Sequence, residues 1–194
     1  CIGNAKNCSY PQKHVVTNAD ELQEAVKYDH VCAEYKGNYR SISNFTVSDV
    51  VVMDLDNDHP DNPADWVTEE KLDEMMPDIS YAIAPSRHHM LPKDGKSARP
   101  KYHVYFPIEE CQDAEEYAAI KRGIHSAFPV FDDNALDAAR FLFGADPGEV
   151  VWHEGWVNID SEVEIAEEED EDFSTGGVIT AGHRNNTLSR FAGR

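Results

Sequence analysis

The chain has 194 residues, of which 41% are hydrophobic, and its formal net charge at pH 7 is −20. This length allows one sizeable core, so we expect one domain of catalytic size with appendages. No segment approaches the roughly 18 consecutive apolar residues of a membrane-spanning helix, and residues 1–14 lack the apolar centre of a signal peptide. The composition therefore predicts a soluble, cytoplasmic protein without a membrane partner.

The charge is unevenly distributed along the chain. Residues 160–172 carry nine acidic side chains and no basic one, whereas residues 85–103 carry five lysines and arginines against one aspartate. The net charge argues against a nucleic-acid partner, but the basic segment offers a local site for phosphates. The acidic segment is interpreted as a linker.

Four cysteines, at positions 1, 8, 32 and 111, include no Cys-x-x-Cys pair, so we expect reduced thiols. Cys1 and Cys8 with nearby histidines offer half of a zinc site. Their spacing is loose, which favours ordinary thiols.

Hydrophobic periodicity predicts helices interspersed with strands. Helical patterns occupy residues 19–28, 68–76, 113–128 and 134–144. Strand patterns occupy residues 31–36, 50–55, 79–84, 101–108 and 149–159, the last as a strand or a hairpin. Asn18 or Thr17 should cap the first helix and Thr68 the second, while Gly144 should close the last helix and Pro107 should end the fourth strand. The strand at 50–55 is too apolar to have one wet face, so we expect it in the middle of a sheet.

Asp54 and Asp56 stand at the carboxyl end of that apolar strand. Strand side chains alternate with period two, so the two carboxylates should point to the same side. Oxygen ligands in this arrangement suit Mg²⁺ or Mn²⁺ and, with them, in-line phosphoryl transfer. Taken alone, an Asp-x-Asp pair is more typical of an ordinary acidic strand-to-loop junction. An EF-hand-like calcium loop fits poorly, because His59 stands where the loop needs glycine.

A second group of polar residues begins at Ser86 in the basic loop and ends on the strand KYHVYF. Alternation places Lys101, His103 and Tyr105 on one face of this strand. Cations and an imidazole suit the phosphates of a nucleotide triphosphate. For His103 alone, a structural histidine is an equally good interpretation.

A third group lies in the segment FDDNALDAARFLFG. Asp132 follows an apolar pair, as an acid at the end of a strand would, and is the candidate third carboxylate, with Asp133 as its competitor. Asp137 and Arg140 stand three residues apart and are expected to pair with each other on a helix.

These three groups together resemble, in order and spacing, the archaeo-eukaryotic primase superfamily, with MDLD, KYHVYF and VFD as its three motifs. The flanking segments DLDNDHPDNPADW and FDDNALDAARFLFG are similar to primase-polymerases of phages and mobile elements. The resemblance covers about residues 30–158. It implies a two-lobed α/β (α+β) fold with an RRM-like antiparallel sheet.

The resemblance also implies the site residues. Asp54, Asp56 and Asp132 would bind Mg²⁺ or Mn²⁺, and His103 would contact the phosphates of the nucleotide. The family's second motif usually has serine two residues before its histidine, where this chain has Lys101. Either Lys101 or Ser86 would take over that contact.

Further candidates flank these motifs. Arg87, beside Ser86, is a further candidate for nucleotide binding, and Arg40 could line the site, although a surface turn explains Arg40 equally well. Aromatic side chains could stack on bases, although core packing is the commoner role; these are Tyr39, Phe45 and Trp66.

The function predicted from this resemblance is a DNA primase or polymerase that transfers nucleotides from NTPs or dNTPs onto a single-stranded DNA template. Residues 1–159 would form the catalytic domain, 160–174 the acidic linker and 175–194 the start of a helical primase-associated domain. We expect a longer polypeptide with a downstream helicase domain, from a phage, plasmid or integrated element. The alternatives are a non-catalytic module that binds single-stranded nucleic acid in replication and a metal-dependent nuclease.

Overall fold

A five-stranded antiparallel sheet organises the computed structural model, which describes residues 3–58, 61–93, 95–134, 136–146 and 149–163. The strands follow the order β1-β2-β4-β3-β5. The described residues also contain three α-helices, so the fold is a mixed α/β one. The helical start expected at 175–194 and nearly all of the expected acidic linker lie outside these ranges. No helix among the described residues is long and apolar enough to cross a membrane.

The bounds of the elements are as follows. The strands are β1 Glu34–Tyr35, β2 Phe45–Leu55, β3 Tyr81–Pro85, β4 Tyr102–Cys111 and β5 Val151–His153. The α-helices are α1 Ala19–Ala25, α2 Glu69–Met75 and α3 Ala114–Ala127. Short 3₁₀ turns are η1 Lys36–Asn38, η2 Ile42–Asn44, η3 Pro63–Asp65 and η4 Ile159–Ser161.

Each α-helix begins at a polar cap. The side chain of Asn18 accepts a hydrogen bond from the backbone N–H of Glu21, and that of Thr68 accepts one from Lys71. Asp113 accepts two, from the first turn of α3. These caps satisfy N–H groups that have no partner inside a helix, which confirms the predicted starts of α1 and α2.

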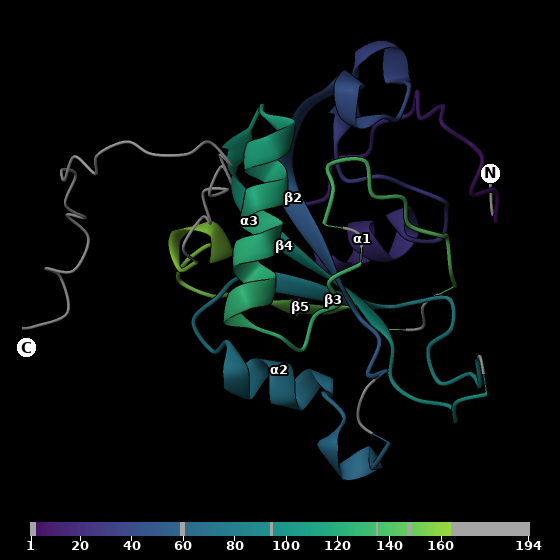
Figure 1. Cartoon of the computed structure of the whole chain (residues 1–194), viewed down its shortest axis with the longest axis vertical. Helices are drawn as coiled ribbons and strands as arrows, with labels where there is room; N and C mark the ends of the chain where they lie inside the picture. Colours follow the sequence, from purple (N-terminus) through teal and green to yellow (C-terminus); the bar gives the residue numbers. More distant parts are fainter. Residues whose placement is uncertain (1–2, 59–60, 94, 135, 147–148, 164–194) are drawn as a thin grey trace, which may run out of the picture.

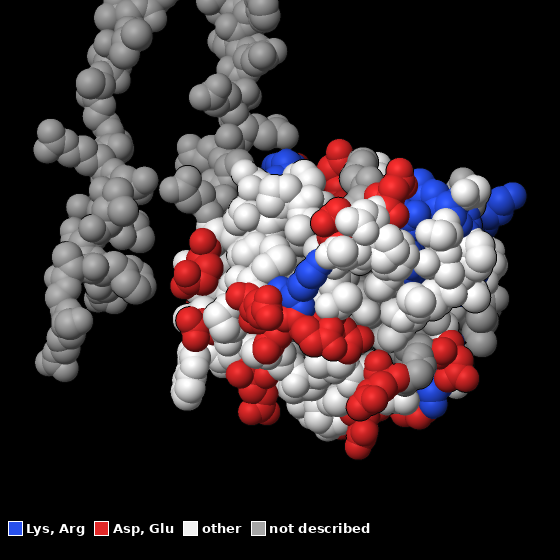
Figure 2. Space-filling model, turned by 90° about the horizontal axis from the view of Figure 1, so that it is seen from below, with Lys and Arg blue, Asp and Glu red and all other residues white. Residues whose placement is uncertain are grey.

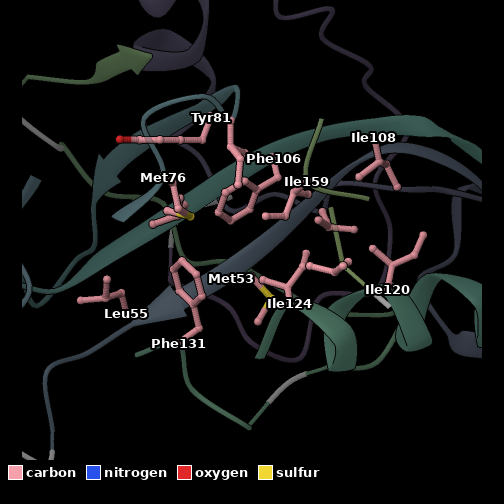
Figure 3. Packing of buried hydrophobic residues seen from close by; sticks show 14 of the residues in the cluster. Met53, Leu55, Met76, Tyr81, Phe106, Ile108, Ile120, Ile124, Phe131 and Ile159 are labelled. Atoms are coloured by element: carbon pink, nitrogen blue, oxygen red, sulfur yellow. The ribbon is translucent and has the colours of Figure 1, made fainter. Parts of the chain in front are cut away.

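The alternation of β2 and β4 separates two apolar faces of the sheet. Val51, Met53 and Leu55 of β2 pack with Val104 and Phe106 of β4 in the larger hydrophobic cluster. Helices α2 and α3 also contribute to this cluster, and Figure 1 shows α3 lying across the sheet. Figure 3 shows the isoleucines of α3 close to the β-strand side chains. Burial of these apolar side chains stabilises the central strands β2 and β4.

The opposite face is covered by α1. Leu22 of α1 and Val26, the residue that caps its C-terminus, pack with Val52 of β2 and Tyr105 of β4 in a second cluster, to which Leu142 also belongs. Because strand side chains alternate, this face also carries Asp54, two residues after Val52, and His103, two residues before Tyr105. The site is therefore at the polar end of the face that α1 covers.

The helix predicted at residues 134–144 is wrong. The described part of this segment is irregular, and Leu142 forms an isolated bridge with His30 through two hydrogen bonds of 3.0 Å. Tyr35 donates to the carbonyl of Ala138 at 2.8 Å, and Arg40 donates to that of Ala139 at 2.9 Å. These long-range hydrogen bonds use carbonyl groups that a helix would need for its own ladder.

Several strand boundaries also differ from the prediction: β2 begins at Phe45 instead of residue 50, and β3 is shifted to Tyr81–Pro85. Strand β4 continues past Pro107 to Cys111, because the β2–β4 register slips next to Pro107 and the missing N–H is tolerated there. The strand expected at 31–36 is reduced to the two residues of β1, and the segment 149–159 contributes the single strand β5. Past the predicted domain end at 159, Val163 still packs in the main cluster.

Gly144 is required by a close backbone approach. A Cβ atom there would lie 2.6 Å from the carbonyl oxygen of Lys27 and 2.8 Å from the amide nitrogen of Asp29. We expect Gly144→Ala to lower the free energy of unfolding by about 2–4 kcal/mol, measured by urea denaturation. Gly37→Ala is the matched control: Gly37 also needs a special conformation (φ 65°) but has open space around it, so its loss should be only about 1 kcal/mol. Equal losses would contradict this packing argument.

Candidate functional site

The pairing of β2 with β4 brings the first two predicted motifs together. Asp54 and His103 are direct partners in the register, and Ala84 of β3 lies on the other side of His103. The Nε2 atom of His103 is 3.5 Å from Oδ1 of Asp54, which is an ion-pair distance but too long for a good hydrogen bond. The prediction that Lys101, His103 and Tyr105 share a face is confirmed, because the residues between them point into the opposite cluster.

The third predicted motif is tied to the first by its backbone. The N–H of Asp132 donates to the carbonyl oxygen of Asp54 at 2.8 Å. The preceding residue, Phe131, is buried against Phe106 and anchors this turn in the core. Asp132 therefore sits in a turn beside the end of β2, although it does not end a strand as the sequence suggested.

Arg140 forms an ion pair with Oδ2 of Asp54. The predicted pairing of Arg140 with Asp137 is wrong: Asp137 instead accepts a hydrogen bond from the N–H of Ala139 at 2.7 Å. Without a helix at this segment, the two side chains do not share a helical face. The side chain of Asp54 is only 12% exposed, and its Oδ1 atom has no hydrogen-bond partner among the described residues.

Lys101 lies between two carboxylates. Its Nζ atom is 3.2 Å from Oδ2 of Asp56 and 3.0 Å from Oδ1 of Asp58, and its side chain is 5% exposed. Lys96, from the basic loop, also reaches Asp58 at 3.4 Å. The basic segment therefore folds back on the acidic end of β2 and neutralises part of its charge.

The surroundings of Asp132 disfavour the charged form of its carboxyl group. Burial, and after it the carboxylates of Asp56, Asp54 and Asp58, together raise its pKa from 3.8 to about 6, while Lys101 acts in the opposite direction. Asp133, by contrast, is exposed. Strongly perturbed acids at such a cluster are typical of functional sites, which favours Asp132 over Asp133 as the third carboxylate.

His103 is largely buried, and this burial disfavours its charged form. Burial lowers its pKa below the ordinary 6.5, although the nearby Asp54 carboxylate opposes this shift. Beside it, Nε2 of His30 is 2.9 Å from the hydroxyl of Tyr105, and burial lowers the pKa of His30 to about 4. No local sequence pattern indicates a role for His30, because its partner Tyr105 lies on a strand 75 residues away.

Lys121 of α3 is a further charged residue near the site that the sequence analysis missed. It is 1% exposed, and burial lowers its pKa to about 8 while the Asp54 carboxylate acts in the opposite direction. A signal was present in the sequence: Lys121 stands four residues after Tyr117 and three before Ile124, on the apolar stripe of the helix.

The remaining predicted nucleotide-binding residues lie around these groups. The N–H of Ser86 donates to the carbonyl of Lys101 at 2.9 Å, and Arg87 packs on Phe143 with its guanidinium 3.8 Å from the ring centre. Both line an open cleft of about 560 Å³ together with His89. Arg40 instead donates a hydrogen bond to the carbonyl of Ala139, the residue that precedes Arg140 in the sequence.

The three aromatic candidates for base stacking are placed differently. Phe45 packs against the core near Tyr117, as the commoner role predicts. Trp66 lies 5.5 Å from the guanidinium of Arg99. Tyr39 is 55% exposed and is the one of the three best placed to meet a base from solvent.

The donor set fits a hard divalent cation in part. Aspartate oxygens are the ligands that Mg²⁺ and Mn²⁺ prefer, and the buried Oδ1 of Asp54 lacks a partner. On the other hand, no three His, Cys, Asp or Glu side chains of the described residues converge as a ready-made cation cage. Arg140 and Lys101 instead form ion pairs with Asp54 and Asp56. A metal ion would have to displace these two side chains or share the carboxylates with them. Calcium-loop geometry has no support, because Lys101 forms ion pairs with Asp56 and Asp58, two of the acidic side chains that such a loop would use as ligands.

The surface charge is divided among patches. Figure 2 views the molecule from the end where α2 lies; acidic side chains form separate groups there, and the largest basic group lies at one margin. The strongly negative net charge therefore leaves room for local attraction of phosphates.

Comparisons of the chain with family models, with curated proteins and with solved structures found no match. The chemistry of the site itself therefore carries the functional interpretation.

Proposed function

We propose that the chain is a nucleotidyltransferase of the DNA primase-polymerase type, with Asp54, Asp56 and Asp132 as its metal ligands. One observation carries the proposal: three acidic side chains gather at the end of β2, close enough for Asp54 and Asp56 to raise the pKa of Asp132. Like charges held together cost stability unless a cation balances them in the working state. The neighbouring imidazole and lysine add groups that suit phosphates.

Each residue has a role in this proposal. Mg²⁺ or Mn²⁺, when bound, would lower the pKa of the attacking hydroxyl and neutralise charge on the leaving pyrophosphate. Asp54, Asp56 and Asp132 would position the reacting groups through these ions. Neutral His103 can donate a hydrogen bond to a phosphate oxygen, and Lys101 can do so once nucleotide draws it from Asp56.

The proposed substrates come from the resemblance to primase-polymerases. A 3′-hydroxyl on a single-stranded DNA template would attack the α-phosphate of an NTP or dNTP. Ser86 and Arg87 line the open cleft that begins at Pro85, the last residue of β3, and would hold the nucleotide beyond its phosphates. The antiparallel sheet supports the proposed RRM-like core, and the two-lobed architecture and a downstream helicase domain belong to the same proposal.

A second candidate function is a non-catalytic module that binds single-stranded nucleic acid. The observation favouring it is that Asp54 and Asp56 are already paired with Arg140 and Lys101. Such pairs give the carboxylates a structural role without any ion.

A primer-extension assay separates these functions. The chain would be incubated with a labelled primer on single-stranded DNA, Mn²⁺ or Mg²⁺ and nucleotides, with EDTA as the control. We expect the primer to lengthen, and only in the presence of the ion. Shortening that ignores nucleotides would identify a nuclease, and template binding without any change of primer length would favour the binding module.

A further inference from the structure

The ion pair between Arg140 and Asp54 is made by an anchored backbone and a partly exposed side chain. The backbone on both sides of Arg140 is held, by the hydrogen bond from Arg40 to Ala139 and by the bridge between Leu142 and His30. The side chain of Arg140 is 35% exposed, whereas that of Asp54 is 12% exposed. The guanidinium can therefore change partner without any change in the fold.

Both members of this pair have unused hydrogen-bonding capacity. The buried Nε of Arg140 and the buried Oδ1 of Asp54 have no hydrogen-bond partner among the described residues. Arginine carries five N–H donors in a planar fork that matches phosphate oxygens, so a phosphate would use donors that one carboxylate oxygen leaves idle. A buried N–H donor without an acceptor lowers stability. A ligand that supplied an acceptor for Nε of Arg140 could therefore displace the present pairing with Asp54.

We propose that Arg140 is an exchangeable counter-ion of Asp54, which moves to a phosphate group of a nucleotide when a divalent cation takes its place on the carboxylate. This inference rests on the proposed function for the identity of the two ligands. Its consequence is that the cation and the polyphosphate bind cooperatively. The cation releases Arg140 from Asp54 for the phosphate, and the phosphate draws Arg140 away from Asp54 and frees that carboxylate for the cation. Arg140 is then a positioning residue for the cation and a binding residue for the phosphate.

The test is the binding of Mn²⁺ alone, followed by the electron paramagnetic resonance signal of the free ion, in the wild type and in Arg140→Met at pH 7.5. Removing the competing guanidinium should tighten Mn²⁺ binding about tenfold. Binding of dATP in EDTA should weaken by a similar factor in the same variant. A merely structural arginine would not produce opposite changes in the two affinities.

Two further variants serve as controls for the loss of an arginine and for the loss of its charge. Arg122→Met removes an arginine from an ion pair with Glu115 on the surface of α3, and should leave both affinities unchanged. Arg140→Lys keeps the charge with fewer donors and should tighten Mn²⁺ binding by less than Arg140→Met does. If a folded Arg140 variant binds Mn²⁺ no more tightly than the wild type, the inference is wrong. Primer extension by the wild type judges the proposed function separately: opposite affinity changes without extension would support the inference and reject the polymerase.

Discussion

Replacing Asp54 by asparagine will reduce primer extension by about 10³-fold or more, while the fold remains intact. Asp54 lies at the centre of the site, in contact with Arg140 and His103 and joined through its carbonyl to Asp132. Asparagine keeps the volume but removes the negative charge that a divalent ion needs, and electrostatic contributions of this kind are usually the largest in catalysis. The measurement is single-turnover extension of a labelled primer, with circular dichroism to verify folding.

Asp49→Asn is the matched control for this change. Asp49 is on the same strand β2 but is exposed, so its replacement should leave extension within about twofold of the wild type. Stability should hardly change in Asp54→Asn, because the partly exposed Arg140 side chain can turn toward water when its partner is lost. A folded Asp54→Asn protein that still extends primers at the wild-type rate would remove Asp54 from the catalytic role.

Replacing Asp132 by asparagine will abolish extension to a similar extent and yet stabilise the fold at neutral pH. The pKa of this carboxyl group is raised from 3.8 to about 6, so the folded protein holds its proton more tightly than the unfolded chain does. The wild type therefore loses stability as the pH rises from about 4 to about 6, and this loss persists above pH 6. After allowance for solvent screening, Asp132→Asn should gain about 1 kcal/mol at pH 7.

Urea denaturation at pH 4 and pH 7, combined with primer extension, checks both parts of this expectation. The two proteins should be equally stable at pH 4, where the carboxyl group is protonated in the folded state, and should differ at pH 7. Asp133→Asn is the control, since Asp133 is the exposed neighbour, and it should affect neither quantity. Greater stability of the wild type at pH 7, or a larger loss of extension in Asp133→Asn, would show that the wrong aspartate has been chosen.

The sequence alone was sufficient for the features that depend on local pattern. Period-two alternation predicted that Lys101, His103 and Tyr105 share one face of β4, and the order of apolar residues placed Asp54 at the end of an internal strand. Cap residues at Asn18 and Thr68 predicted two helix starts, because each satisfies N–H groups within its own turn. These predictions succeeded because strand alternation and helix capping involve residues near one another in the chain.

Only the tertiary structure decided the partners of the charged groups. Arg140 pairs with a residue 86 positions away, and its segment is not helical because Tyr35, Arg40 and His30 take its backbone groups. The preference for Asp132 over Asp133 depends on which carboxyl group is turned toward Asp54 and Asp56, and the two neighbours are alike in local pattern. The charge balance of the site is a property of contacts between distant segments, and helical periodicity at residues 134–144 was overridden by those same contacts.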